Sequence, residues 1–65
     1  MSRAFDNSMD VLRELIRQKM NEMSDHVATG SCKDYSEYTH SCGVIQGLAL
    51  AERELLDLKE RIEGA

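Results

Sequence analysis

The chain has 65 residues, with 12 acidic and 8 basic side chains and a formal net charge of −4. A chain of this length forms one domain at most, predicted to cover residues 1–65, and it supports only a marginal hydrophobic core. The acidic balance argues against nucleic acid as a partner, because binding to phosphates needs a basic patch.

Membrane insertion and secretion are also disfavoured by the sequence. The longest apolar run, residues 48–51, is far too short to span a bilayer. The chain does not open with the succession of basic, apolar and small residues that makes a signal peptide. We therefore expect a cytosolic or assembled-particle setting, without a signal peptide and without a membrane-embedded segment.

The first predicted element is a helix over residues 5–28, with residues 1–4 frayed. Its apolar residues recur at helical spacing and form one stripe: Phe5, Met9, Leu12, Ile16, Met20, Met23 and Val27. Val11 and Leu15 widen this stripe on one flank. The remaining surface is charged and is expected to be solvated, with local ion pairs Asp10–Arg13 and Glu14–Arg17.

A short polar connection at residues 29–34 follows. Gly30 comes directly after the periodic run and supplies the left-handed conformation that closes a helix. Ser31, with Asp34 three residues later, is typical of a helix N-cap with an acidic partner. We therefore predict an all-α fold, an antiparallel two-helix hairpin with a tight Gly30–Ser31 turn and a second helix over residues 32–63, closed by Gly64.

The second helix carries apolar residues in two directions, roughly 130° apart at helical geometry. One set is Tyr38, Cys42, Ile45, Ala49 and Leu56, and the other is the heptad-spaced seam Val44, Leu48, Ala51, Leu55, Leu58 and Ile62, a spacing used in coiled coils. A single neighbouring helix cannot cover both directions. We predict that the hairpin is oligomeric or bound to a larger partner, and that the partner-binding residues are Val44, Gly47, Leu48, Ala51, Leu55, Leu58 and Ile62. The alternative is one broad core face with a few exposed leucines.

Gly43 and Gly47 lie in the interior of this helix, where each costs roughly 1 kcal/mol relative to alanine. Followed by Ala51, they form a smooth ridge that allows another helix to approach closely. The sequence leaves open whether that helix is the first helix or a neighbouring chain.

Two cysteines and two histidines suggest a zinc site: His26, Cys32, His40 and Cys42. His40 and Cys42, two residues apart on a helix, point roughly 200° apart and cannot share one ion. Ten residues along one helix separate the two cysteines by about 15 Å, too far for an internal disulfide. We therefore expect no metal, no cofactor and no disulfide.

Catalytic motifs are missing from the sequence. It has no glycine-rich phosphate loop, no G-x-S-x-G and no H-E-x-x-H. A two-helix hairpin is also expected to lack the concavity of roughly 300 Å³ or more that a ligand pocket needs. We predict that the protein is not an enzyme and has no small-molecule substrate.

A resemblance is carried by residues 30–38, Gly-Ser-Cys-Lys-Asp-Tyr-Ser-Glu-Tyr, and 42–48, Cys-Gly-Val-Ile-Gln-Gly-Leu. This pattern resembles one in small uncharacterised proteins of tailed bacteriophages, similar short chains often encoded among virion structure and packaging genes. The match spans residues 27–57, about half of the chain. It implies a phage origin, with a location in the virion or the host cytoplasm.

Two functions from different classes are consistent with the pattern. The first is a non-enzymatic virion or assembly accessory protein that binds itself or a larger phage structural protein, such as a portal, capsid or tail component. The second is a small acidic phage protein that binds a host enzyme and modulates it. The apolar seam would serve either function.

Overall fold

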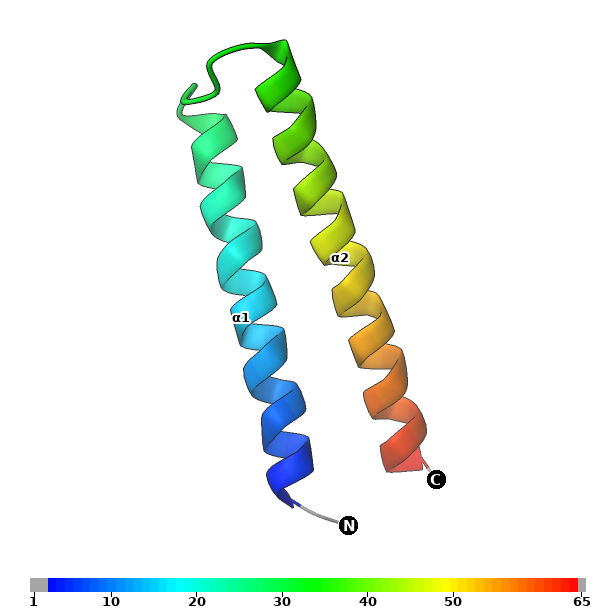
Figure 1. Cartoon of the computed structure of the whole chain (residues 1–65). Helices are drawn as coiled ribbons and strands as arrows, with labels where there is room; N and C mark the ends of the chain where they lie inside the picture. The colour runs from blue at the N-terminus through cyan, green and yellow to red at the C-terminus, as the bar shows by residue number, and fades with distance from the viewer. Residues whose placement is uncertain (1–2, 65) are drawn as a thin grey trace.

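The computed structural model describes residues 3–64, and their side chains from Ser8 onward. Two helices, α1 (Arg3–Ala28) and α2 (Tyr35–Gly64), run antiparallel side by side, and residues 3–64 contain no strand (Figure 1). The Cα trace is elongated, 48 Å long and 15 × 12 Å across. The predicted all-α, two-helix hairpin is thereby confirmed.

The N-terminal boundary of α1 differs from the prediction by two residues. The helix begins at Arg3 instead of Phe5, so residues 3 and 4 are helical, whereas they were expected to fray. Residues 1 and 2 lie outside the described part of the chain, and so does the predicted contact of the Phe5 side chain.

The C-terminus of α1 is closed by a glycine, as predicted. Gly30 has a φ of 72°, in the left-handed region. The amide of Ser31 donates to the carbonyl of His26 at 3.1 Å, and that of Gly30 to the carbonyl of Val27 at 3.1 Å. This pair of bonds is the Schellman arrangement, which satisfies carbonyls that the end of a helix would otherwise leave unpaired.

The start of α2 was predicted wrongly, at Cys32 with Ser31 as the cap. The helix begins at Tyr35, and its cap is Asp34, whose Oδ1 accepts a hydrogen bond from the amide of Glu37 at 2.8 Å. Ser31 cannot start α2, because its amide belongs to the motif that closes α1. Its hydroxyl is hydrogen-bonded to that of Thr29 at 2.9 Å. The turn at Gly30 and Ser31 is therefore extended by three residues, and Asp34 serves as N-cap where an N3 position was expected.

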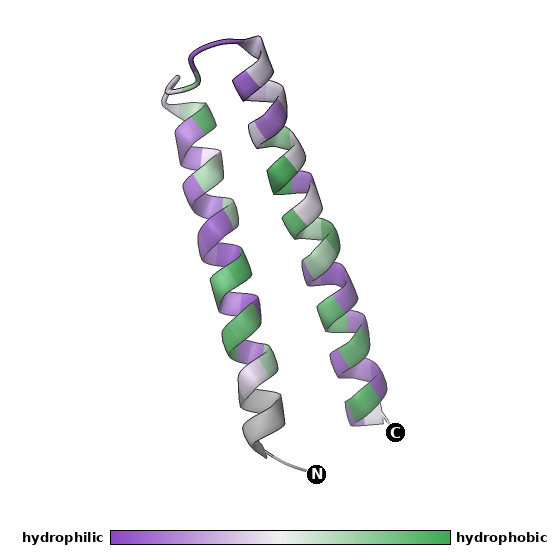
Figure 2. Ribbon diagram, viewed as in Figure 1, coloured by the Kyte–Doolittle hydropathy of each residue, from purple (hydrophilic) through white to green (hydrophobic). Residues whose placement is uncertain are grey.

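The core is a single line of contact between the two helices. Hydropathy alternates along both of them, so neither is uniformly apolar (Figure 2). Among the side chains of residues 8–64, Met9 is the only hydrophobic one that is buried, at 6% exposure. Ser41 and Glu52 are buried polar residues on α2. The half-buried aliphatic and methionine side chains are Ile16, Met20, Met23 and Val27 on α1, and Val44, Ile45, Leu48, Leu55 and Ile62 on α2.

Candidate functional site

The two long edges of the hairpin differ in chemistry. One edge is charged and is formed by Asp10, Arg13, Arg17, Glu52 and Lys59. Arg17 Nε donates to Glu52 Oε2 at 2.6 Å, and Arg13 Nε donates to the same oxygen at 3.3 Å. Lys59 Nζ donates to Asp10 Oδ1 at 2.5 Å. We call this set the charged edge, and its bonds connect α1 to α2.

Glu52 is the central residue of the charged edge. It is only 8% exposed, although it is a carboxylate on a two-helix protein. The hydrogen bond from Arg17, followed by the positive charges of Arg17 and Arg13, holds the pKa of Glu52 below its ordinary value despite the opposing effect of burial. Glu52 is therefore held as a carboxylate shared by two arginines. The predicted local pairs Asp10–Arg13 and Glu14–Arg17 are replaced by these contacts across the helices.

The opposite edge carries several apolar side chains. At roughly 100° per residue, Leu12 and Leu15 lie on the other side of the α1 contact line from Arg13 and Arg17. By the same geometry, Ala51 and Leu58 lie on the other side of the α2 contact line from Glu52 and Lys59. Since the charged flanks meet on one edge, these apolar flanks meet on the other.

Much of this apolar surface is solvent-exposed. Leu12 is 48% exposed, Leu15 55% and Leu58 43%, and Ala51 is exposed too. We call the set Leu12, Leu15, Gly47, Ala51 and Leu58 the apolar edge, and Val11 continues it outward on α1. Sequence reasoning found the α2 half of this edge. It missed the α1 half, because Leu12 was assigned to the core stripe and Val11 and Leu15 to its flank.

The predicted partner-binding residues are divided by the structure. Val44, Leu48, Leu55 and Ile62 are half-buried along the line of contact with α1. Gly47, Ala51 and Leu58 are exposed on the apolar edge. The seam does not face α1 at every position. Glu52 and Lys59 contact charged residues of α1, and Ala51 and Leu58, one residue before each of them, are turned by roughly 100° away toward the other edge. Binding of a partner by the exposed members stays a prediction.

The glycine ridge does not pack on α1. A Cβ added to Gly43 or to Gly47 would have no atom within 4 Å to meet, apart from the neighbouring backbone of its own helix. Both glycines are exposed, as is Ala51. The choice that the sequence left open is therefore resolved against α1, and the ridge forms a smooth strip on the outer surface.

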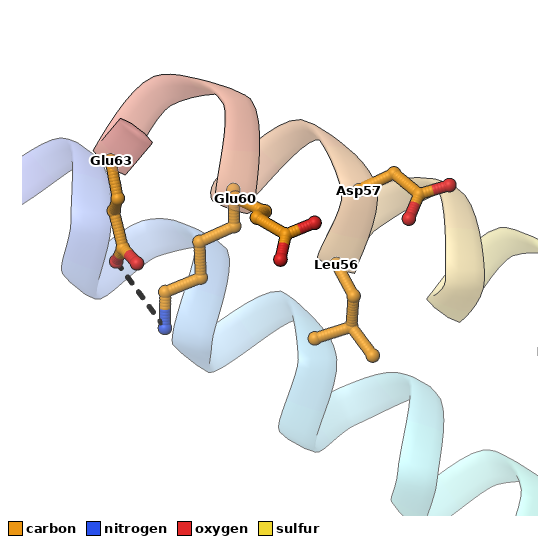
Figure 3. A pocket seen from close by; sticks show the side chains of 5 residues that line it. Leu56, Asp57, Glu60 and Glu63 are labelled. Carbon is orange, nitrogen blue, oxygen red and sulfur yellow. Dashed lines mark ion pairs between the residues drawn. The ribbon is translucent and has the colours of Figure 1, made fainter. Parts of the chain in front are cut away.

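Two shallow depressions lie on the surface of α2. One, of about 430 Å³, is lined by Gln46, Ala49, Leu50 and Arg53. The other, of about 340 Å³, is lined by Leu56, Asp57, Lys59, Glu60 and Glu63 (Figure 3). Within it, Lys59 Nζ lies 4.0 Å from Glu63 Oε2. Both exceed the volume that a hairpin was expected to offer, so that expectation was wrong. Each is lined by side chains of one helix only and is open to solvent, so neither encloses a ligand as an active site does.

The closed end of the hairpin gathers a different set of side chains. His26 Nε2 lies 3.1 Å from Glu37 Oε1, joining the last turn of α1 to the first turn of α2. Cys32, between the helices, brings its Sγ within 4.8 Å of ligand atoms of both residues. The sequence placed Cys32 on α2 and so missed this cluster, because it did not anticipate that the chain continues to Asp34 before α2 begins.

His40 and Cys42, which were also considered as zinc ligands in the sequence and rejected, do not belong to this cluster. His40 is exposed on α2. Cys42 is half-buried. Its hydrogen bond with Tyr38 raises the pKa of the Tyr38 phenol. The Tyr38 ring stacks on that of Tyr35, with ring centroids 6.2 Å apart. Both cysteines are free thiols.

Comparisons with known proteins find no matching family model, curated protein or solved structure. The phage resemblance of residues 27–57 therefore stays a prediction. Over residues 3–64, neither helix combines the length and the apolar character needed to cross a membrane.

Proposed function

We propose that the chain is a non-enzymatic interaction protein that self-associates through its apolar edge and acts as an accessory of a larger assembly. The observation that carries the proposal is the exposure of Leu12, Leu15 and Leu58 on one edge while the opposite edge is closed by ion pairs. Burying a leucine fully is worth roughly 1.5–3 kcal/mol, so covering this edge would add substantially to a small core.

A second copy of the chain is the occupant that fits best. A pair of helices with one buried hydrophobic side chain among residues 8–64 has little stability of its own. Two copies that meet through the same edge would form a symmetric contact, in which four helices surround a shared core. The exposed Gly47 and Ala51 would let the facing helix approach closely.

Sedimentation of the purified chain tests this proposal. We expect a dimer or larger species that the double variant Leu15→Asp, Leu58→Asp converts to a folded monomer. The matched control is Leu50→Asp, Leu56→Asp, which adds the same two charges at exposed leucines off this edge and should leave the assembly intact. A wild-type monomer, or equal loss of assembly in both double variants, would contradict the proposal.

Gly47→Ala provides an independent arm of the test. Nothing lies within 4 Å of the added methyl group, so the hairpin itself should gain about 0.5–1 kcal/mol from the better helix former. The same methyl group would stand between two copies and should weaken association. Stronger association of this variant would mean that the ridge is not part of the contact.

The resemblance of residues 27–57 supports placing this assembly in a tailed phage, with a portal, capsid or tail protein as the larger neighbour. Mass spectrometry of purified virions tests that role, since an accessory of the particle should be present in repeated copies. Early expression, absence from virions and a defined complex with a host enzyme would favour a host-directed modulator instead.

A further inference from the structure

The closed end of the hairpin brings together three side chains that are suited to bind a metal ion. One imidazole nitrogen of His26, Sγ of Cys32 and a carboxylate oxygen of Glu37 all lie within 4.8 Å of one another. The three residues come from the last turn of α1, the connection and the first turn of α2. All three are half-buried, so the cluster is sheltered but can be reached from solvent.

Hydrogen bonds donated by backbone amides, which do not use these three side chains, hold the cluster together. The bond from the Ser31 amide to the His26 carbonyl folds the connection back over the end of α1 and keeps Cys32 beside His26. The bond from the Glu37 amide to Asp34 Oδ1 sets the first turn of α2 and thereby the place of Glu37. The ligand-bearing residues are therefore positioned by the same contacts that build the turn.

We propose that His26, Cys32 and Glu37 form a binding site for Zn²⁺, or for a divalent ion of similar preference. Thiolate and imidazole are ligands that zinc favours, and carboxylate oxygen also binds zinc, whereas Mg²⁺ and Ca²⁺ prefer oxygen alone. Zinc bonds of about 2.0–2.3 Å in a tetrahedron separate ligand atoms by about 3.3–3.8 Å. Small rotations of the three side chains would bring them from the observed spacing to this one.

Three protein ligands leave one tetrahedral position for a water molecule. On binding, Cys32 gives its thiol proton to solvent and coordinates as the thiolate. The bound ion would tie both helices to the connection, and it would stabilise the folded hairpin because the three ligands are brought together only on folding. The site lies at the opposite end from Met9 and Lys59 and is separate from the apolar edge.

Cys32 distinguishes this site from a simple ion pair. The contact between His26 and Glu37 at 3.1 Å would by itself account for two members of the cluster. An ion pair has no requirement for a thiol, whereas the metal site depends on it. The chain also supplies its own controls, since Cys42 and His40 are the same residue types outside the cluster.

Titration of the full chain with Co²⁺, a spectroscopic substitute for zinc, tests the proposal. We expect a thiolate-to-cobalt charge-transfer band and the visible bands of tetrahedral cobalt, saturating at one ion per chain and displaced by Zn²⁺. Cys32→Ser should remove the charge-transfer band and weaken zinc binding by more than about tenfold. Cys42→Ser and His40→Ala should leave the spectrum and the affinity unchanged.

Glu37→Gln provides a second variant should Cys32→Ser fold poorly. The backbone amide of Glu37, and not its side chain, takes part in the cap, so α2 should start as before while zinc affinity falls. Circular dichroism would verify folding of each variant. A wild-type chain without a charge-transfer band, a band that survives Cys32→Ser or disappears in Cys42→Ser, or saturation at one ion per two chains would overturn the proposed site.

Discussion

The two ends of the hairpin are built by different means. At the closed end, backbone hydrogen bonds join residues that are close in the sequence, within residues 25–31 and within residues 34–38. At the open end, Lys59 reaches Asp10 across 49 positions of the sequence, and Met9 is buried on the same part of α1. Hydrogen bonds between residues close in sequence thus dominate the closed end, where His26 and Glu37 add a contact between the helices, whereas contacts between side chains of α1 and α2 hold the open end. Changes at the open end should therefore act through lost packing, and changes at the closed end through backbone strain or the loss of a capping hydrogen bond.

The largest effect is expected at the open end. Met9→Ala removes the one buried hydrophobic side chain among residues 8–64 and should lower the free energy of unfolding by about 2 kcal/mol. Leu50→Ala is the matched control, because Leu50 is exposed on the outer surface and its truncation should cost about 0.5 kcal/mol or less. Equal losses in urea denaturation would show that the open end is not held by packing.

At the closed end, Gly30→Val should lower the free energy of unfolding by more than about 1 kcal/mol. A β-branched residue is strained at the φ of 72° that Gly30 adopts. Gly30→Asn is the control, because asparagine tolerates this conformation better and should cost less. Thermal unfolding measures both variants, and a valine variant as stable as wild type would refute the role of Gly30 in closing α1.

The cap of α2 should contribute somewhat less. Asp34→Ala removes the acceptor of the Glu37 amide and is expected to cost about 1 kcal/mol, whereas Asp34→Asn retains a capping oxygen and should be nearly neutral. Ser31→Ala tests which residue caps α2, since the sequence predicted Ser31 and the structure shows Asp34. If its loss of stability exceeded that of Asp34→Ala, α2 would begin earlier than Tyr35.

The smallest effect is expected in the pH dependence of folding stability, to which Glu52 of the charged edge contributes. Arg17 lowers the pKa of Glu52 in the folded chain, so the stabilisation from Glu52 is complete above the ordinary glutamate pKa of about 4.3. It is lost as the pH falls from there through the lowered folded pKa. Glu52→Gln should flatten this acidic part of a stability–pH curve. An unchanged slope in the Glu52→Gln variant would mean that the arginines do not favour the carboxylate.

The fold could be predicted from the sequence because its signals are local. Apolar spacing in each half of the chain and one glycine between them were enough to predict two helices and the left-handed closure at Gly30. The start of α2 could not be assigned reliably, since Ser31 and Asp34 are both good caps and the Schellman bonds that engage Ser31 depend on three-dimensional geometry.

The side chains that face across the hairpin were harder to predict. Periodicity gives the positions that share a side of a helix, but it does not tell which charged residues find partners on another helix. Glu52 was therefore not expected to be buried, although Arg13 and Arg17 reach it from α1. The cluster of His26, Cys32 and Glu37 was missed for a related reason, since it depends on the path of the connection and not on spacing within a helix.

The position of the helix ends has a mechanical consequence. α1 starts and α2 finishes at the same end of the molecule (Figure 1). A force that pulls these ends apart would unzip the hairpin, breaking the cross-helix contacts one after another instead of loading them all at once in shear. The helices of 26 and 30 residues together measure about 84 Å, so complete unzipping would move the ends at least that far apart without melting either helix, and the connection would add to this distance. A hairpin pulled apart at its open end yields at low force and over a long distance, whereas one whose helices are loaded in shear resists.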